Sequence, residues 1–367
     1  MSEPENEEEP KLIRVLIVDD SAYNRKYIAD ILNASGEIEV VGKAGDGEEA
    51  LRLAAQLKPD VITLDLEMPR MDGFTFLRIL MARQPTHVIV VSSYKQKENT
   101  LKAIELGALE FVAKPKSQLS PDVVDIRAEI LQKVLMASKA RVRRAPPPRA
   151  PLPSLPQTAA STAAMPVNPR LLVGIASSTG GPTALLDIFG RLPRLPAALL
   201  IAQHMPDKFT RTFAERLDRK CRENRDESKV AFRVAEAQDG DQVLTGTAFV
   251  CPGRQCMELL AGPGGEYRLK TGTPGSSDRY VPSADRLLRS VAAAVGARAV
   301  GVVLTGMGDD GVEGARAVRD AGGVVLVESP ESAVVFGMPG AVVRAGLANH
   351  VLSLPAIVDF LASHASF

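Results

Sequence analysis

Short apolar runs alternate with amphipathic segments along the first part of the chain. Near-continuous runs of about four to eight valines, isoleucines and leucines favour buried strands, whereas apolar positions that recur every three or four residues favour helices. Strands are expected at 12–20, 38–44, 61–69, 87–93 and 111–115. Helices are expected at 22–35 and 47–57 and between the later strands. This alternation predicts a five-stranded parallel sheet with helices on both faces.

The C-terminal part of the chain repeats the pattern. Buried strands are expected at 171–176, 197–204, 299–306 and 322–328, separated by helical stretches such as 209–220. Segments 229–253 and 265–272 instead carry glycine and aspartate turn residues between short apolar runs, which predicts hairpin strands. The expected architecture is a doubly wound α/β domain with a mostly parallel sheet and an inserted antiparallel hairpin.

Two stretches lack any pattern that would build a core. The first residues, MSEPENEEEP, are acidic and poor in apolar side chains, which does not fit a secretory signal and predicts a disordered tail. A proline- and alanine-rich stretch follows the first set of strands and is typical of a linker. The expected organisation is a tail at 1–11, a first domain at 12–136, a linker at 137–169 and a second domain at 170–363.

Composition narrows the function classes. Lysine plus arginine and aspartate plus glutamate both number 44, so no overall basic field favours nucleic acid. No apolar run approaches the roughly 20 residues that cross a bilayer, so membrane insertion is not expected. The only cysteines, Cys221, Cys251 and Cys256, argue for a reducing compartment and for buried free thiols. These features together predict a cytoplasmic globular protein.

Charged and hydroxyl side chains follow the expected strands of the first domain. Asp19 and Asp20 end the first strand, Asp65 the third and Ser92 the fourth, and Lys114 follows the fifth. Functional groups gather at the carboxyl ends of strands in open α/β sheets. Three converging carboxylates repel one another unless a cation neutralises them, and an oxygen-only set suits Mg²⁺. A lysine there can pair with a phosphoryl oxygen.

These residues sit in the segments VLIVDDSAYNR, TLDLEMPRMDG, VVSS and FVAKP, which resemble the receiver domain of two-component response regulators. The resemblance covers about residues 12–130 and implies a flavodoxin-like, CheY-like fold. It implies that Asp65 accepts a phosphoryl group from a CheA-type histidine kinase. It also implies Mg²⁺ ligation by Asp20, Asp65 and the backbone carbonyl of Glu67, with Asp19 acting through water.

The same resemblance assigns three further residues. Ser92 would hydrogen-bond the phosphoryl group, and Lys114 would neutralise it. Phe111 occupies the position of the family's switch aromatic, which is often a tyrosine. Since phenylalanine has no hydroxyl, it cannot make the hydrogen bond that a tyrosine would make in the active state.

A second set of polar residues follows strands of the C-terminal domain. Ser178 and Thr179 end one expected strand, His204 ends the next, and Asp310 follows a third. Serine attacks a carbonyl only when a base takes its proton, and a carboxylate then orients and stabilises the imidazole. Gly180 and Gly181, just before a helix start, would offer backbone N–H groups to an oxyanion. A simple turn or a nucleotide-phosphate loop is the alternative for this glycine-rich segment.

The segments GIASSTGGP, AQHMPDKFTRTFAERLD, LTGMGDDGVEGARAV and VFGMPGAVVRAG resemble the catalytic domain of the chemotaxis protein-glutamate methylesterase (CheB) family over about residues 168–363. The resemblance implies that Ser178 is the nucleophile, His204 the base and Asp310 its orienting acid. Thr179 and Met307 would lie beside the reacting centre, where their backbone could help bind the oxyanion. The choice of Ser178 over the adjacent serine rests on its register with the TGG that follows. Asp309, next to Asp310, could partly replace it.

The resemblance implies an enzyme that hydrolyses glutamate γ-methyl esters on chemoreceptors, without a cofactor for the ester chemistry, and that also deamidates receptor glutamines. The receiver would cover the active-site face until phosphorylation of Asp65 loosens it. Two alternatives involve no hydrolysis: a nucleotide-binding regulator that uses SSTGGP as a phosphate loop, and a module that only binds a receptor.

Overall fold

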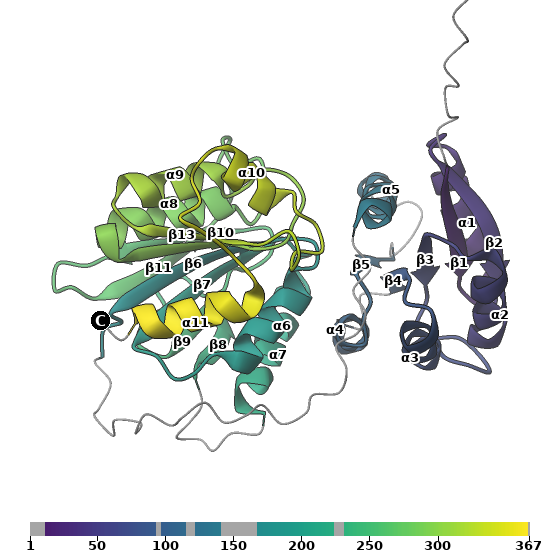
Figure 1. The fold of residues 1–367 in the computed structure, drawn as a ribbon, viewed down its shortest axis with the longest axis horizontal. Helices are drawn as coiled ribbons and strands as arrows, with labels where there is room; N and C mark the ends of the chain where they lie inside the picture. The colour runs from purple at the N-terminus through teal and green to yellow at the C-terminus, as the bar shows by residue number, and fades with distance from the viewer. Residues whose placement is uncertain (1–11, 93–96, 115–121, 141–166, 224–230, 366–367) are drawn as a thin grey trace, which may run out of the picture. The chain divides into compact units, whose positions relative to one another are not determined.

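The computed structural model describes residues 12–92, 97–114, 122–140, 167–223 and 231–365 (Figure 1). The chain divides into two compact units on either side of residue 147, and each is described by itself. The expected acidic tail at 1–11 and most of the expected linker at 137–169 lie outside the described residues.

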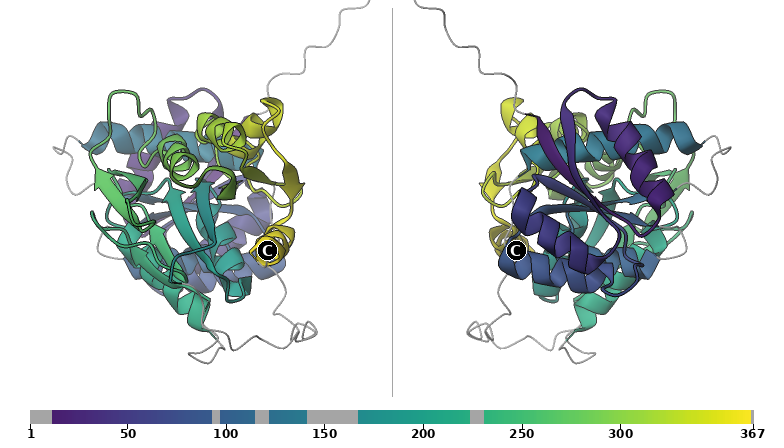
Figure 2. Two further views of the ribbon diagram at one scale, coloured as in Figure 1. Left: turned by 90° about the vertical axis from the view of Figure 1, so that its left-hand side faces the viewer. Right: turned by 90° about the vertical axis from the view of Figure 1, so that its right-hand side faces the viewer.

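The first unit is a five-stranded, wholly parallel sheet in the order β2-β1-β3-β4-β5. Its elements are β1 (Ile13–Val18), α1 (Ala22–Asn33), β2 (Ile38–Ala44), α2 (Gly47–Leu57), β3 (Val61–Leu64), α3 (Gly73–Arg83), β4 (His87–Ser92), α4 (Lys97–Glu105), β5 (Glu110–Ala113) and α5 (Asp122–Lys139). Helices α1 and α5 pack together, as do α2 and α3, with the twisted sheet between the two layers (Figure 2). Every side chain of β3, β4 and β5 is buried, as a sheet covered on both faces requires. The five expected strands and the parallel topology are confirmed.

The second unit is built around a seven-stranded parallel sheet in the order β14-β13-β12-β6-β7-β9-β8. Its strands are β6 (Leu171–Ser177), β7 (Ala197–Gln203), β8 (Arg233–Glu236), β9 (Thr247–Val250), β10 (Cys256–Ala261), β11 (Tyr267–Gly272), β12 (Ala299–Val303), β13 (Val324–Glu328) and β14 (His350–Leu352). Its helices are α6 (Gly181–Arg191), α7 (Thr210–Arg222), α8 (Ala284–Val295), the 3₁₀ turn η2 (Gly296–Arg298), α9 (Val312–Asp320), α10 (Met338–Arg344) and α11 (Leu354–His364). Helices α6, α7 and α11 lie on one side of the sheet, and α8, α9 and α10 on the other (Figure 1).

The prediction of a hairpin within 229–253 is wrong. Strands β8 and β9 pair in parallel and extend the main sheet beside β7. The turn-rich segment between them bonds to β11 instead: Gln242 forms an antiparallel bridge with Arg268, and Val243 N–H donates to the Tyr267 carbonyl. Strand β11 therefore supports the connection between the parallel strands β8 and β9. Turn residues alone do not distinguish such a connection from a hairpin.

The antiparallel hairpin of this unit is β10–β11, in which Cys256 pairs with Gly272 and Ala261 with Tyr267. Its inner side chains, including Leu259 and Leu269, join the same buried cluster as Leu288 of α8. The hairpin is thereby fixed against α8, the helix that begins at the site described below.

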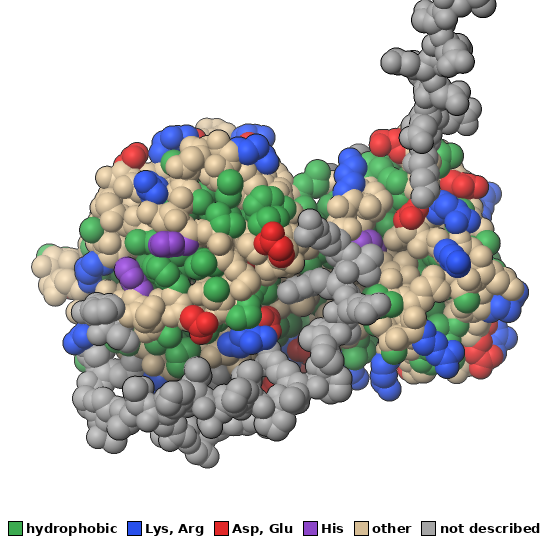
Figure 3. Space-filling view, in the orientation of Figure 1, with side chains coloured by type: hydrophobic (Ala, Val, Ile, Leu, Met, Phe, Trp, Pro, Cys, Tyr) green, Lys and Arg blue, Asp and Glu red, His purple; other side chains and the backbone are tan. Residues whose placement is uncertain are grey.

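Three expectations from composition can be compared with the structure. The three cysteines are buried and unbridged, as expected. Among the helices in the described ranges, none has the length and apolar character needed to span a bilayer. On the face drawn in Figure 3, basic and acidic side chains are interspersed around apolar ones, in agreement with the equal numbers of the two charges.

Candidate active site

Strand register brings Ser178 and His204 side by side. Strands β6 and β7 are parallel neighbours in which Ser177 pairs with Gln203, so Ser178 and His204 are the next residue on each strand. The His204 N–H donates to the Ser177 carbonyl at 3.0 Å. On the other side of β6, β12 runs parallel, and the Ser178 N–H donates to the Thr305 carbonyl at 3.0 Å. The loop that carries Asp310 therefore starts beside Ser178.

Asp310 holds the imidazole of His204. Its Oδ2 lies 2.8 Å from His204 Nε2, across 106 residues of sequence. The carboxylate is almost fully buried and also accepts the N–H groups of Ala284 (2.8 Å) and Asp285 (2.9 Å) at the start of α8. These donors and the helix dipole stabilise its negative charge. Since Nε2 is engaged, Nδ1 is the ring nitrogen left to take a proton.

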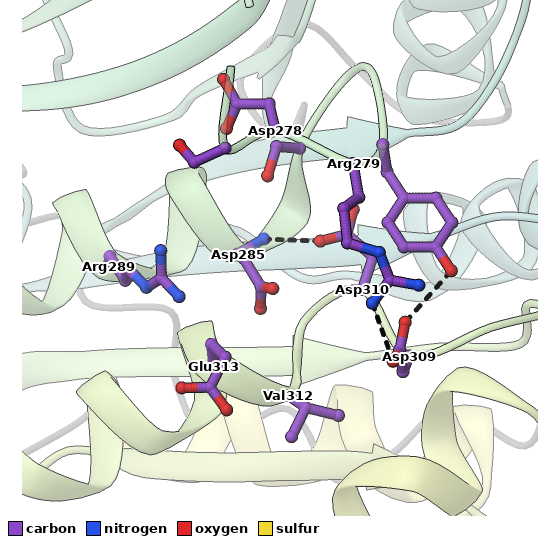
Figure 4. Close-up of a pocket in the computed structure, with 11 residues that line it drawn as sticks. Asp278, Arg279, Asp285, Arg289, Asp309, Asp310, Val312 and Glu313 are labelled. Carbon is purple, nitrogen blue, oxygen red and sulfur yellow. Dashed lines mark hydrogen bonds and ion pairs between the residues drawn. The ribbon is translucent and has the colours of Figure 1, made fainter. Parts of the chain in front are cut away.

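Asp285 makes the corresponding interaction with the start of α9. Its Oδ1 accepts the N–H groups of Gly311 (2.9 Å) and Gly314 (2.7 Å) at the start of α9. Burial raises the pKa of Asp285, although the hydrogen bond from the Gly314 N–H opposes this shift. The charge of Asp310 also raises this pKa. Asp310 thus caps α8, in whose first turn Asp285 lies, and Asp285 caps α9, which follows Asp310. This pair fixes the Asp310 loop against α8 (Figure 4).

Gln203, which sequence reasoning missed, links the segment of Ser178 to His204. Its Nε2 donates to the backbone carbonyls of Ser178 and His204, both at 2.9 Å. Its Oε1 accepts the Ser177 hydroxyl at 2.7 Å, and both of these side chains are fully buried. A Cβ at Gly181 would lie 2.1 Å from Gln203 Oε1, so only glycine fits there. Ser177 thus faces the interior, whereas Ser178 is half-buried at the strand end.

The turn after Ser178 differs in one respect from the expected oxyanion site. The Gly181 N–H donates to the Ser178 carbonyl at 2.8 Å, so it is used within the turn and does not face a ligand. This bond also counts against a phosphate loop at the same glycines. The N–H groups of Thr179 and Gly180 have no hydrogen-bond partner among the described residues. Met307 follows Gly306 as an exposed side chain near this turn.

We expect the Gln203→Leu variant to lose both stability and activity. Leucine leaves the Ser177 hydroxyl and the His204 carbonyl without their hydrogen bonds, which costs about 1–3 kcal/mol of unfolding free energy for a buried polar group. A displaced Ser178 or His204 lowers kcat by up to about 100-fold. Urea unfolding and steady-state ester hydrolysis would measure both effects, with exposed Gln238→Leu as the control. Wild-type kcat in a folded Gln203→Leu protein would contradict the role assigned to Gln203.

The acidic residues of the first unit also converge. Carboxylate oxygens of Asp19, Asp20 and Asp65 lie within 4.8 Å of one another. Lys114 Nζ lies 2.6 Å from Asp65 Oδ2 and 2.9 Å from Asp19 Oδ2. Burial raises the pKa of Asp65 despite the opposing charge of Lys114. Burial lowers the pKa of Lys114, but Asp65 and Asp19 outweigh it and the net shift is upward. This oxygen-only donor set fits a divalent cation such as Mg²⁺.

The other residues singled out in the first unit lie near this edge or in the core beneath it. Buried Ser92 ends β4, and its carbonyl accepts the Lys114 N–H at 2.7 Å, so both belong to one edge of the sheet. Exposed Glu67 has its backbone nitrogen 3.5 Å from Asp65 Oδ1. Phe111 is buried within β5, and Lys133 Nζ lies 5.2 Å from its ring centroid. The structure therefore brings Asp19, Asp20, Asp65, Ser92 and Lys114 to one sheet edge, with Phe111 turned into the core.

These two units define a response regulator whose second unit carries a serine, a histidine and an aspartate at the carboxyl edge of a parallel sheet. The chain belongs to the CheB methylesterase family: the model of that name matches residues 173–361, and that of the response regulator receiver domain matches residues 15–121. The family and the α/β architecture implied by the sequence motifs are confirmed.

Relatives match nearly the whole chain. It is 44% identical over 361 residues to protein-glutamate methylesterase/protein-glutamine glutaminase 3 of Geobacter sulfurreducens, covering 93% of this chain and 94% of the relative. It is 44% identical over 355 residues to protein-glutamate methylesterase/protein-glutamine glutaminase 1 of Myxococcus xanthus, covering 96% and 97%. A relative of the same description from Pyrococcus abyssi is 40% identical over 350 residues, covering 95% of this chain and 92% of the relative.

Proposed function

We propose that this chain is a phosphorylation-regulated protein-glutamate methylesterase that also acts as a protein-glutamine glutaminase, and that it works through Ser178, His204 and Asp310. The observation that carries the proposal is the 2.8 Å bond between His204 Nε2 and Asp310 Oδ2, on a histidine that the strand register sets beside Ser178. The descriptions of the relatives support the substrate class.

The ester chemistry follows from this geometry. Ser178 Oγ attacks the γ-carbonyl carbon while His204 Nδ1 takes its proton, and Asp310 stabilises the resulting imidazolium. The N–H groups of Thr179 and Gly180 stabilise the oxyanion, with the Met307 backbone close by. The C–O bond breaks, and methanol leaves with the proton from His204. Water, deprotonated by His204, then attacks the acyl-enzyme and releases glutamate and Ser178.

A glutamine side chain can follow the same route. Attack by Ser178 on the amide carbon gives the same acyl-enzyme, and the proton on His204 leaves with ammonia instead of methanol. Hydrolysis again releases a glutamate side chain. The proposed substrates are glutamate γ-methyl esters and glutamines of cytoplasmic chemoreceptor segments.

The first unit would control this activity. Asp65 would accept the phosphoryl group from a CheA-type histidine kinase, and Lys114 would move its ion pair from the Asp65 carboxylate to a phosphoryl oxygen. Asp20, Asp65 and the Glu67 carbonyl would hold Mg²⁺, with Asp19 acting through water. When bound, the ion would neutralise carboxylate and phosphoryl charge. Phosphorylation would then shift the chain from an arrangement in which the receiver covers the esterase site to an open one.

The Asp65→Asn variant tests this control. We expect acetyl phosphate with Mg²⁺ to raise methanol release from methylated receptor by roughly tenfold in the wild type. The variant should keep the basal rate and show no rise, because an amide does not accept the phosphoryl group. Exposed Asp30→Asn is the matched control and should respond as the wild type does. A full response of Asp65→Asn would rule out this mode of control.

A further inference from the structure

A strap between β11 and α8, residues 273–283, lies beside the imidazole of His204. The Tyr280 ring stacks on the imidazole with its centroid 5.4 Å away and an angle of 8° between the planes. Aromatic rings at this separation attract one another when offset, and a protonated imidazole gains further from a π face. His204 is therefore in contact with an aromatic side chain that the proposed mechanism does not use.

Tyr280 is itself held in place by its neighbours. Its hydroxyl donates to Asp309 Oδ1 at 3.1 Å, and Arg279 lies 5.6 Å from the ring centroid and 3.4 Å from Asp309 (Figure 4). Burial and Asp309 raise the pKa of Tyr280, so the phenol keeps its proton and donates it. A Cβ at Gly308 would lie 2.6 Å from the Tyr280 hydroxyl oxygen, so this approach requires glycine.

The base of the strap is tied to two further elements. Asp278 Oδ2 accepts the Gly275 N–H at 2.7 Å and the Arg286 guanidinium of α8 at 3.0 Å. Arg286 also bonds Glu258 of β10 at 2.8 Å. Burial acts to raise the pKa of Asp278, but its bonds with Gly275 and Arg286 outweigh it and lower the pKa, as expected of an ionised anchor. The strap is thus fixed at both its base and its tip.

We propose, on the basis of the proposed esterase mechanism, that Tyr280 is a positioning residue that fixes the ring plane of His204. The bond from Nε2 to Asp310 sets one point of the imidazole but leaves the ring free to rotate about that contact. Stacking against Tyr280 removes this rotation, so Nδ1 is held toward Ser178 while Nε2 stays on Asp310. Asp309 serves this arrangement by holding Tyr280.

The first test compares Tyr280→Leu with Tyr280→Phe in the full chain. A rate of Ser178 labelling by a fluorophosphonate reports serine activation without receptor binding, and methanol release gives kcat and KM. We expect Tyr280→Leu to lower the labelling rate and kcat by about 100-fold with KM within twofold. Tyr280→Phe keeps the ring, so its labelling rate and its kcat should both lie within a few-fold of the wild-type values. Asp309→Asn weakens the tie to the hydroxyl and should resemble Tyr280→Phe.

A second test does not depend on activity. The proton between His204 and Asp310 should give a downfield ¹H NMR signal that persists in Tyr280→Phe and is broadened by exchange in Tyr280→Leu. A sharp signal and wild-type labelling in Tyr280→Leu would overturn the proposal. A raised KM with unchanged kcat would do so as well, because it would place Tyr280 in substrate binding. No labelling of the wild type would reject the proposed mechanism instead, while the NMR result would still decide whether Tyr280 orders the ring.

Discussion

Ser178→Ala is expected to lower kcat for methanol release by about 10⁶-fold, because removal of the nucleophile of such a unit removes nearly all covalent catalysis. Binding of methylated receptor should persist, since the hydroxyl is not needed to hold the ester. Steady-state methanol release and fluorophosphonate labelling of the same preparations would measure the loss. The remaining rate would report what the turn and its N–H groups contribute alone.

Ser177→Ala is the matched control for that experiment. Ser177 is buried on Gln203, so its loss removes one hydrogen bond and costs about 1 kcal/mol of unfolding free energy. We expect Ser177→Ala to keep most of the wild-type rate of methanol release and the full rate of fluorophosphonate labelling. If Ser177→Ala were inactive and Ser178→Ala active, the nucleophile would be Ser177. Activity in both variants would point to another mechanism.

Asp310→Asn is expected to lower kcat by about 10⁴-fold, since an amide neither stabilises the imidazolium nor enforces the required tautomer. The variant also loses charge at the start of α8, where Asp310 accepts two backbone N–H groups. The midpoint of urea unfolding should therefore fall as well. Methanol release and urea unfolding would measure these losses separately.

Asp309→Asn provides the comparison for Asp310. Both Asp309 oxygens have other partners, Tyr280 and Arg279, and the carboxylate is about half exposed. We expect kcat to fall by less than about tenfold, because only the bond that holds Tyr280 is weakened. High activity in Asp310→Asn that disappears in the double variant would mean that Asp309 replaces its neighbour after all.

The sequence allowed both sets of site residues to be chosen because polar residues directly after buried strands can be read locally. Parallel strands place such residues at one edge, so Ser178, His204 and Asp310 could be grouped without knowing their contacts. The order β12-β6-β7 and the register between Ser177 and Gln203 could not be read, since they depend on packing between distant segments. The choice of Ser178 over Ser177 rests on its register with the TGG that follows, and the structure adds that Ser177 is buried against Gln203 whereas Ser178 is half-buried.

The residues missed by sequence reasoning have ordinary patterns. Gln203 is one residue of an expected strand, and Asp285 is an acidic residue in the first turn of a helix, where such residues are common. Tyr280 lies in a turn-rich segment without periodicity. Their roles come from partners far along the chain. The error at 229–253 has the same origin, because the support for that connection comes from β11.

The position of β6 has a consequence for biosynthesis. This first strand of the second unit lies at the centre of its sheet, yet its neighbour β12 follows only after β7 to β11 have been made. Contacts between such distant segments form slowly, because a long loop must close first. While β12 is still in the ribosome, the growing polypeptide holds a serine and a histidine without their acid. By the proposed mechanism, the nascent protein therefore gains esterase activity only after Asp310 has emerged.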